Sequence, residues 1–384
     1  MSEHDDTSGP SVPWPGEPGE PDDPGAAFPP APPSAPDSEA GDTELWDREL
    51  WDTERRDAEL RERLAAAVDA VDAPDAVFAV SRGGRRVLCA GGTAPPPSVP
   101  REDLRYEIGS ASKAFAGLLL AQLIRRGVLT GGEPAAACLD PGRDPGAHPV
   151  TLAHLITHTS GLPKLPGDFY VRCLPAWRTN PYARYPADRV TDAFLRHRPR
   201  HRPGTRWRYS NFGVAVLGHA VTAATGTPWE DLLTAQVLRP LGMHGTALRA
   251  EDPKTDATGH RQDGRTPVPA FDAGGFEAAG ALRATPHDLL TFLEAHLDPV
   301  GALRAVRTPV LRRGLGHRHV HTVAWFRHPT PGGPMYFHSG ATLGQQAFLG
   351  FRPDTGTAVA AVCSRRFRHG DPFVTTAYGI LAEP

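Results

Sequence analysis

The sequence predicts an α+β fold: an antiparallel β-sheet flanked by helices, with a helical lobe inserted between the two parts of the sheet. Strand patterns occur near the amino end, over residues 77–92, and again after residue 312. Helical patterns occupy most of the sequence between them. Because both ends of the chain supply strands, we expect one sheet that joins them across an intervening helical region.

The amino-terminal region differs in composition from the rest of the chain. The first 40 residues hold 11 of the 41 prolines, together with Gly, Ser, Asp and Glu. This segment has few large apolar groups, so their burial cannot offset the entropy lost on ordering. We therefore expect a disordered tail over residues 1–41 and one domain over 42–384. Within that domain we expect an α/β lobe from 42–110 and about 270–384, and a helical lobe from about 111–269.

Local patterns predict the elements of the amino-terminal half. After Asp42, apolar residues recur at helical spacing among alternating charges, at Leu60, Leu64, Val68 and Val71. The segment 77–92 reads as two strands joined at Gly83 and Gly84, since paired glycines supply the positive φ of a tight hairpin turn.

Further helices and strands follow along the chain. Helices are expected over 112–126, which ends at Gly127, over 150–162, and over 211–225, which Gly226 stops. Another helix starts at Thr285-Pro286-His287-Asp288, with a hydroxyl at the cap and a proline in the first turn. The strand segments at the carboxyl end are 321–328, 335–340, 344–351 and 357–364.

Charge and cysteine content exclude several classes of function. Lys and Arg number 41 against 44 Asp and Glu, so the net charge of −3 gives no general attraction to nucleic acid or to an anionic membrane. We therefore expect a small-molecule or peptide partner. The four cysteines include no C-x-x-C pair, which argues against a structural zinc site or a dense disulfide framework and favours reduced thiols.

The sequence also predicts a cellular location. Residues 1–16 carry neither a basic segment nor an apolar run of signal-peptide length. The most apolar stretch, 114–124, contains Gln122 and is far shorter than the ~20 residues that cross a bilayer. We expect a cytoplasmic protein.

Ser110 and Lys113 are the first candidate catalytic pair. They stand three residues apart at the start of the apolar helix, in EIGSASKAFAGLLLAQLI, so their side chains share one helical face near its amino end. The positive end of the helix favours an alkoxide on Ser110, and the same field with burial lowers the lysine pKa toward a neutral amine that accepts a proton. By itself the short pattern S-x-x-K also fits a serine cap followed by a solvated lysine.

A second candidate group is Tyr209-Ser210-Asn211, which precedes another helix in RWRYSNFGVAVLG. The Tyr209 phenol can relay a proton, and the Asn211 amide can hold a substrate carbonyl. Alternatively, Ser210 or Asn211 caps the helix while Tyr209 packs beneath it.

A third candidate group is His338-Ser339-Gly340, in YFHSGATLGQQAFLGF on an expected strand. Gly340 lets a substrate backbone approach the strand edge. Taken alone, His338 also fits a partly buried polar residue of a strand.

Together, and in this order, the three groups resemble the penicillin-recognising enzyme superfamily, with its S-x-x-K, Tyr-x-Asn and Lys-Thr-Gly or His-x-Gly elements. The longer segments VTLAHLITHTSGLP, PGTRWRYSNFGVAVLG, LLTAQVLRPLGMHGTAL and AGALRATPHDLLTF resemble the class C β-lactamase, D-aminopeptidase and family VIII esterase branch. The resemblance runs from about residue 45 to the carboxyl end and implies a β-lactamase/transpeptidase-like fold, with no metal and no cofactor.

The resemblance implies a role for each matching residue. Ser110 attacks the substrate carbonyl, and Lys113 with Tyr209 removes and returns protons during acylation and deacylation. Asn211 orients the substrate. The backbone N–H groups of Ser110 and Ala341 form an oxyanion hole, where negative charge develops in the transition state.

The implied substrate-binding strand, His338, Ser339 and Gly340, departs from the β-lactamase pattern. Most β-lactamases have lysine where His338 stands and threonine where Ser339 stands. A permanent cation that holds a β-lactam or D-Ala carboxylate is thus replaced by a group that is largely neutral near pH 7. We therefore expect a serine hydrolase or acyltransferase that works through a Ser110 acyl-enzyme, with esterase or amidase activity above β-lactam hydrolysis.

Two alternatives to hydrolysis stay open: acyl transfer to an amine in specialised metabolism, and a catalytically silent binding protein. An α/β-hydrolase is set aside because the sequence lacks G-x-S-x-G. His317, His319 and His321 alternate on one expected strand face, but no carboxylate or cysteine stands nearby to complete a metal site, so we interpret them as solvated. The sequence indicates no oligomeric state.

Overall fold

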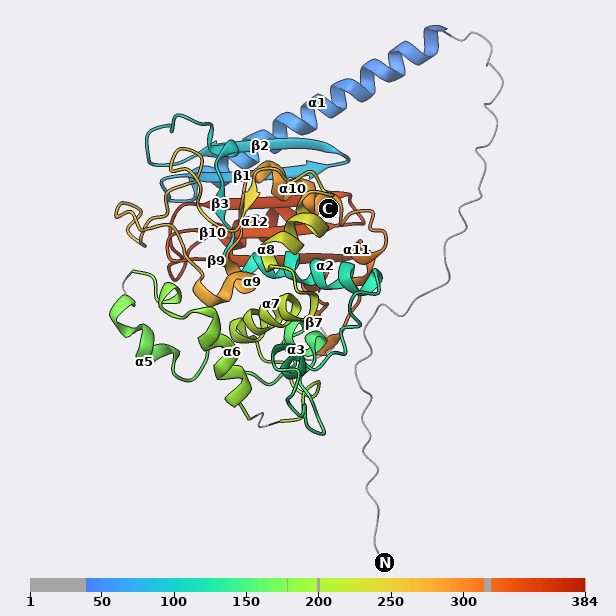
Figure 1. The fold of residues 1–384 in the computed structure, drawn as a ribbon. Helices are drawn as coiled ribbons and strands as arrows, with labels where there is room; N and C mark the ends of the chain where they lie inside the picture. Colours follow the sequence, from blue (N-terminus) through green and yellow to red (C-terminus); the bar gives the residue numbers. More distant parts are fainter. Residues whose placement is uncertain (1–38, 178, 199–200, 314–318, 384) are drawn as a thin grey trace, which may run out of the picture.

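The computed structural model describes residues 39–177, 179–198, 201–313 and 319–383, with side chains from Glu54 onward except at 312, 313 and 319. A disordered tail was predicted over residues 1–41, and residues 1–38 of it lie outside the described part of the chain. Helix α1 begins at Glu39, three residues before the predicted start, and ends at Asp69. Its amino-terminal part extends away from the sheet (Figure 1).

One antiparallel sheet of eight strands, counted over the described residues, forms the centre of the fold (Figure 1). Its order is β2-β1-β11-β10-β9-β8-β7-β6, so strands from the two ends of the chain lie side by side, as the sequence predicts. The strands are β1 Ala76–Arg82, β2 Arg85–Gly91, β6 Leu311–Arg313, β7 His319–His321, β8 Phe326–Pro329, β9 Pro334–Ala341, β10 Gln346–Arg352 and β11 Thr357–Cys363.

Both faces of this sheet are covered by helices, and strand β1 shows the consequence. Val77 and Ala79 belong to one hydrophobic core, whereas Phe78 and Val80 belong to a second core on the opposite face. Helices α1 and α12 (Phe373–Ala382) pack on the second face, and α10 (Pro286–Glu294) packs on the first. A strand that is buried on both sides is apolar without interruption, as AVFAV is here.

The helical lobe lies beyond the first face of the sheet and shares its hydrophobic core (Figure 1). A small three-stranded sheet stands beside it, formed by β3 Tyr106–Glu107, β5 Arg283–Ala284 and β4 Thr246–Ala247. The helices here are α2 Ser112–Arg125, α3 Ala135–Leu139, α4 Leu152–Ile156, α5 Phe169–Cys173, α6 Ala187–Arg196, α7 Asn211–Thr225, α8 Trp229–Leu233, α9 Glu277–Gly280 and α11 Ala302–Ala305.

Several local predictions are confirmed. Helix α7 spans the predicted residues, and Gly226 ends it in the left-handed conformation with φ of 68°. The Thr285 hydroxyl accepts a hydrogen bond from the Asp288 N–H and caps α10. Gly83 and Gly84 turn the first hairpin with φ of 56° and 80°.

Two local predictions are wrong, and one helix was missed. The helix expected over 150–162 ends at Ile156, because the chain turns at His158, whose φ is 58°. The strand expected over 321–328 is interrupted by a turn in which the Thr322 hydroxyl accepts a hydrogen bond from the Trp325 N–H. Helix α12, which covers the second sheet face, was not predicted.

Two findings bear on the function classes weighed above. None of the helices in the described part of the chain is long and apolar enough to cross a membrane. No cluster of three or more potential metal ligands occurs among the described residues, and His317 lies outside them.

Candidate active site

The site forms where the end of strand β9 meets the turn that precedes helix α2. Ser110 lies in a single 3₁₀ turn, Gly109–Ala111, just before α2 rather than in its first turn. A Cβ on Gly340 would lie 1.9 Å from the Ile108 carbonyl oxygen and 2.9 Å from the Ser110 nitrogen. The absence of a side chain at this position therefore lets the strand backbone approach the nucleophile.

The matching glycine on the other side is Gly109, which adopts φ of 50°. A Cβ there would lie 2.8 Å from the Ala341 nitrogen. The backbone of Ala341 is thus held against the turn that carries Ser110. Ser110 and Ala341, the two residues whose N–H groups were predicted to form an oxyanion hole, both line the same cavity.

Lys113 lies beside the Ser110 hydroxyl, as the sequence predicts. Its Nζ is 3.2 Å from Ser110 Oγ and donates to the Ala279 carbonyl at 2.6 Å. The side chain is 1% exposed. Burial, with a smaller contribution from the positive charge of Lys164, lowers the pKa of Lys113 to about 7. A substantial fraction of the amine is therefore neutral near pH 7 and able to accept the serine proton.

Tyr209 completes the group that shares this proton. Its phenol hydrogen-bonds Ser110, and its ring centre lies 5.2 Å from Lys113 Nζ. Burial raises the pKa of Tyr209, and the bond to Ser110 offsets part of this effect. Near neutral pH the phenol is therefore protonated, whereas part of the Lys113 amine is neutral and can accept a proton.

Asn211 is the first residue of α7 and lines the same cavity. Ser210 caps the helix by accepting from the Gly213 N–H at 2.8 Å, so Asn211 is not needed as a cap. Its Nδ2 donates to the Tyr182 hydroxyl at 3.4 Å, and its buried Oδ1 has no partner among the described residues. That oxygen is therefore available to a substrate N–H.

His338 lies in the wall behind the site and does not line the catalytic cavity. It is 4% exposed and borders a smaller cavity together with Lys113, His158 and His321. Nδ1–H donates to the Ser339 carbonyl at 2.7 Å, so this ring nitrogen carries the proton. Burial, followed by the nearby charge of Lys113, lowers the pKa of His338 to about 3. A histidine with this pKa is neutral near pH 7.

Substrate contact by Ser339 is not supported by its position. Strand β9 alternates its faces, so Ser339 shares the face of Met335 and Phe337, which pack in the core under α12. Tyr336, His338 and Gly340 occupy the other face, toward the helical lobe. The residues that line the catalytic cavity accordingly include neither His338 nor Ser339.

The catalytic cavity has a volume of about 190 Å³ and no charged side chain in its lining. Aromatic and hydroxyl groups that the sequence analysis missed form much of it. They come from loops without periodic patterns, so only the fold brings them together. The lining residues are Gly109, Ser110, Tyr182, Asn211, Phe271, Phe276, Ala279, Gly280, Ala341, Thr342 and Leu343.

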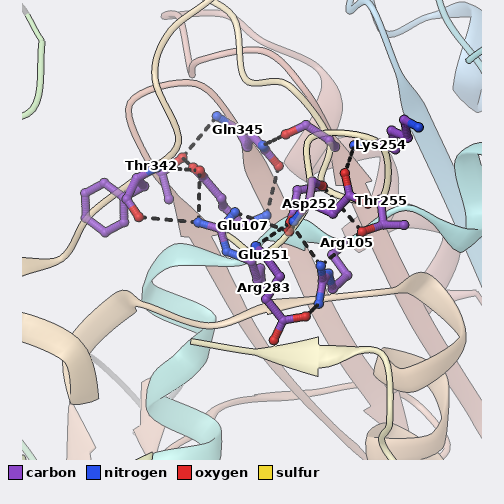
Figure 2. A network of polar contacts seen from close by, with 12 residues as sticks. Arg105, Glu107, Glu251, Asp252, Lys254, Thr255, Arg283, Thr342 and Gln345 are labelled. Atoms are coloured by element: carbon purple, nitrogen blue, oxygen red, sulfur yellow. Dashed lines mark hydrogen bonds and ion pairs between the residues drawn. The ribbon is translucent and has the colours of Figure 1, made fainter. Parts of the chain in front are cut away.

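A buried polar network fixes part of this lining (Figure 2). Glu107, on β3, accepts hydrogen bonds from the Thr342 hydroxyl at 2.5 Å and from the Phe271 N–H at 2.6 Å. The Arg283 guanidinium lies 3.6 Å from the same carboxylate and 3.4 Å from Asp256. Burial raises the pKa of Glu107, and its hydrogen bonds and Arg283 oppose that effect. One carboxylate thus holds two segments of the cavity wall in position.

An inserted helical lobe over an antiparallel sheet, with a serine, a buried lysine and a phenol at their junction, defines the class of serine β-lactamase-like proteins. The sequence model of the Beta-lactamase family matches residues 60–382, and the chain belongs to this family.

Individual relatives agree with this assignment. The structure of a β-lactamase/D-alanine carboxypeptidase from Pseudomonas syringae shares the fold with a TM-score of 0.70 and 20% identity, covering 85% of this chain and 99% of that one. A D-stereospecific amidohydrolase from Streptomyces sp. gives a TM-score of 0.66 and 22% identity, covering 83% and 98%.

In sequence, the D-alanyl-D-alanine-carboxypeptidase/endopeptidase AmpH of Escherichia coli (strain K12) is 29% identical over 223 residues, which are 56% of this chain and 55% of AmpH. The match therefore spans about half the length of that relative.

Proposed function

We propose that the protein is a serine hydrolase that cleaves an ester, amide or peptide bond through an acyl-enzyme on Ser110. The observation that carries this proposal is the 3.2 Å contact between Ser110 Oγ and the Nζ of Lys113, a buried amine with a pKa of about 7. A nucleophile within hydrogen-bond distance of a base that is partly neutral at the working pH is the arrangement that nucleophilic catalysis needs.

The acylation step follows from the positions of the three side chains. Lys113 Nζ takes the proton of Ser110 Oγ as this oxygen bonds to the substrate carbonyl carbon. The negative charge that develops on the carbonyl oxygen is stabilised by the N–H groups of Ser110 and Ala341. Tyr209 then gives its proton to the leaving group as the bond to it breaks, and recovers a proton from Lys113.

Deacylation reverses these roles. Water takes the place of the leaving group, and Lys113 with Tyr209 removes its proton as it attacks the acyl carbon. The proton returns to Ser110 Oγ when the acid product departs. No step requires a group beyond the side chains and backbone N–H groups named here.

The lining of the cavity favours esters and amides over β-lactams. A bound β-lactam brings a carboxylate next to the reacting carbonyl, and no charged side chain lines this cavity to receive it. His338 is neutral and faces a different cavity. The names of the relatives AmpH and D-stereospecific amidohydrolase agree with an amide or peptide substrate.

A substrate panel tests the proposal. Wild type and Ser110→Ala are compared on p-nitrophenyl esters, D-amino acid amides and nitrocefin. We expect ester or amide turnover clearly above nitrocefin turnover in the wild type, and loss of turnover in the variant. Efficient nitrocefin hydrolysis would contradict the preference, and equal rates for both proteins would contradict catalysis. Product analysis with competing amines separates hydrolysis from acyl transfer.

A further inference from the structure

A second groove adjoins the catalytic cavity and has a different chemical character. It has a volume of about 390 Å³ and shares one lining residue, Leu343, with the catalytic cavity. A substrate that fills the first can therefore extend into the second. The groove is lined by Trp177, Thr179, Arg261, Gln262, Asp263, Val268, Leu343 and Arg366.

The backbone holds the two arginines of this groove side by side. His260 and Arg365 form a parallel β-bridge, and the Arg366 N–H donates to the His260 carbonyl at 2.8 Å. Arg261 and Arg366, the residues that follow this bridge, both line the groove. The same segment is joined to the active-site strand end, since the His260 N–H donates to the Gly344 carbonyl at 3.0 Å.

Neither arginine of this pair has an ion-pair partner within 4 Å among the described residues, although the charge of Arg261 acts on Asp263 in the same groove. Neither Arg261 nor Arg366 forms an ion pair or a side-chain hydrogen bond with another described residue. The preceding arginine, Arg365, is in contrast buried and paired with Asp371 at 3.1 Å. Two guanidinium groups that line one groove offer charge-assisted hydrogen bonds to an anion.

The remaining charged group sets the charge of the anion that fits. Asp263 also lines the groove, but its carboxylate accepts three hydrogen bonds from within its own turn: from the N–H of Arg265, and from the N–H and hydroxyl of Thr266. Two guanidinium groups and one carboxylate leave one positive charge, which a monoanion balances. A carboxylate carries one negative charge, whereas a phosphate monoester carries about two.

We infer that the groove of Arg261 and Arg366 is a subsite for a carboxylate of the substrate, one position removed from the reacting carbonyl. The lining of the catalytic cavity includes no charged side chain, whereas the groove supplies two guanidinium groups for a substrate anion. Trp177, Val268 and Leu343 supply apolar walls along the way. The inference rests on the proposed acyl-enzyme chemistry and specifies its substrate class as carboxylate-bearing esters or amides.

Matched pairs of esters test the subsite. One series places the charge on the acyl chain, as mono-p-nitrophenyl esters of dicarboxylic acids of increasing length, each compared with its methyl-capped diester. The other places it on the leaving group, as 4-acetoxybenzoate compared with its methyl ester. We expect kcat/KM in at least one series to be about five- to tenfold higher for the carboxylate at low salt, and the preference to fall as salt is added.

Variants assign that preference to the two arginines. Arg261→Gln with Arg366→Gln should abolish it by lowering kcat/KM for the carboxylate esters to the level of the capped esters. Arg265→Gln is the matched control, because this exposed arginine lies on the same loop but does not line the groove. Equal rates for charged and capped esters in the wild type, or a preference that persists in the double variant, would overturn the inference.

A binding measurement separates this inference from the proposed function. In Ser110→Ala, calorimetry with glutarate monoanilide and its methyl ester reports the groove without chemistry. Tighter binding of the carboxylate, lost on the two arginine substitutions, supports the subsite even if the wild type turns over no ester. Equal binding of the two probes contradicts the subsite whatever the wild-type activity.

Discussion

Replacement of Lys113 by methionine should stabilise the fold while it abolishes activity. The unfolded chain keeps Lys113 protonated up to its ordinary pKa of 10.5, whereas the folded protein holds the pKa at about 7. The difference costs about 4 kcal/mol of folding free energy at pH 7. Methionine removes this cost, but it leaves the buried Ala279 carbonyl without its donor, which costs about 1–3 kcal/mol. We expect Lys113→Met to be more stable by about 1–3 kcal/mol at pH 7.

The pH dependence makes this prediction specific. Between pH 7 and 10.5 the unfolded wild type binds more protons than the folded wild type, so its stability rises with pH. Methionine does not titrate, and the advantage of Lys113→Met should shrink as pH rises, by about 0.7 kcal/mol per pH unit at pH 7 and by up to about 1.4 kcal/mol per unit above pH 8.

Urea unfolding at pH 7 and pH 9 measures both quantities, with Ser110→Ala as a control that keeps the buried amine. The advantage should fall by about 2 kcal/mol between these two pH values. A variant that is less stable at pH 7, or a difference that does not change with pH, would refute the burial argument.

Three further predictions concern the reaction. The kcat/KM for an uncharged ester should rise about tenfold per pH unit below pH 7, as Lys113 loses its proton, and should level off above pH 7. A flat profile from pH 6 to 8 would contradict Lys113 as the base. Gly340→Ala should lower kcat by about 100-fold or more, because the new Cβ would lie 1.9 Å from the Ile108 carbonyl oxygen and push β9 away from the nucleophile. Gly379→Ala is the control and should not lower kcat, because its Cβ would meet nothing within 4 Å. Equal rates for the two variants would contradict the role of the close approach. Tyr209→Phe should lower kcat for amides by about 100-fold but kcat for p-nitrophenyl esters far less, since p-nitrophenolate leaves without a proton. An equal loss of kcat on both substrates would show that Tyr209 does not protonate the leaving group.

Much of the fold could be predicted because its signals are local. The hairpin at Gly83 and Gly84, the Thr285 cap and the Gly226 stop each depend on a few adjacent residues. The helix expected beyond Ile156 failed because a tertiary constraint prevails there: His158 turns into the left-handed region, and its Nδ1 accepts a hydrogen bond from the Ser210 N–H at 3.2 Å.

The candidate site likewise contains residues that local sequence patterns identify and residues that only the fold brings together. Ser110 and Lys113 are one helical turn apart, so the sequence places them together, and Tyr209 was found through its motif. Tyr182 and Phe271 lie on irregular loops whose paths are set by contacts distant in sequence, such as the bond from the Phe271 N–H to Glu107. No periodic pattern marks such residues.

The misplacement of Ser339 had a detectable signal. Side chains alternate along a strand, so Met335, Phe337 and Ser339 share one face. The first two are large apolar residues, which points that face toward a core. The alternation of side chains along MYFHSG therefore predicts that Ser339 points away from the nucleophile.

Covalent labelling of Ser110 tests the central claim most directly. The protein is incubated with a fluorophosphonate at pH 8, and intact mass followed by peptide mapping locates the adduct. We predict one adduct per chain on Ser110, none on Ser110→Ala, and much slower labelling of Lys113→Met. A folded wild type that stays unlabelled, or that carries the adduct at another residue, would contradict the account.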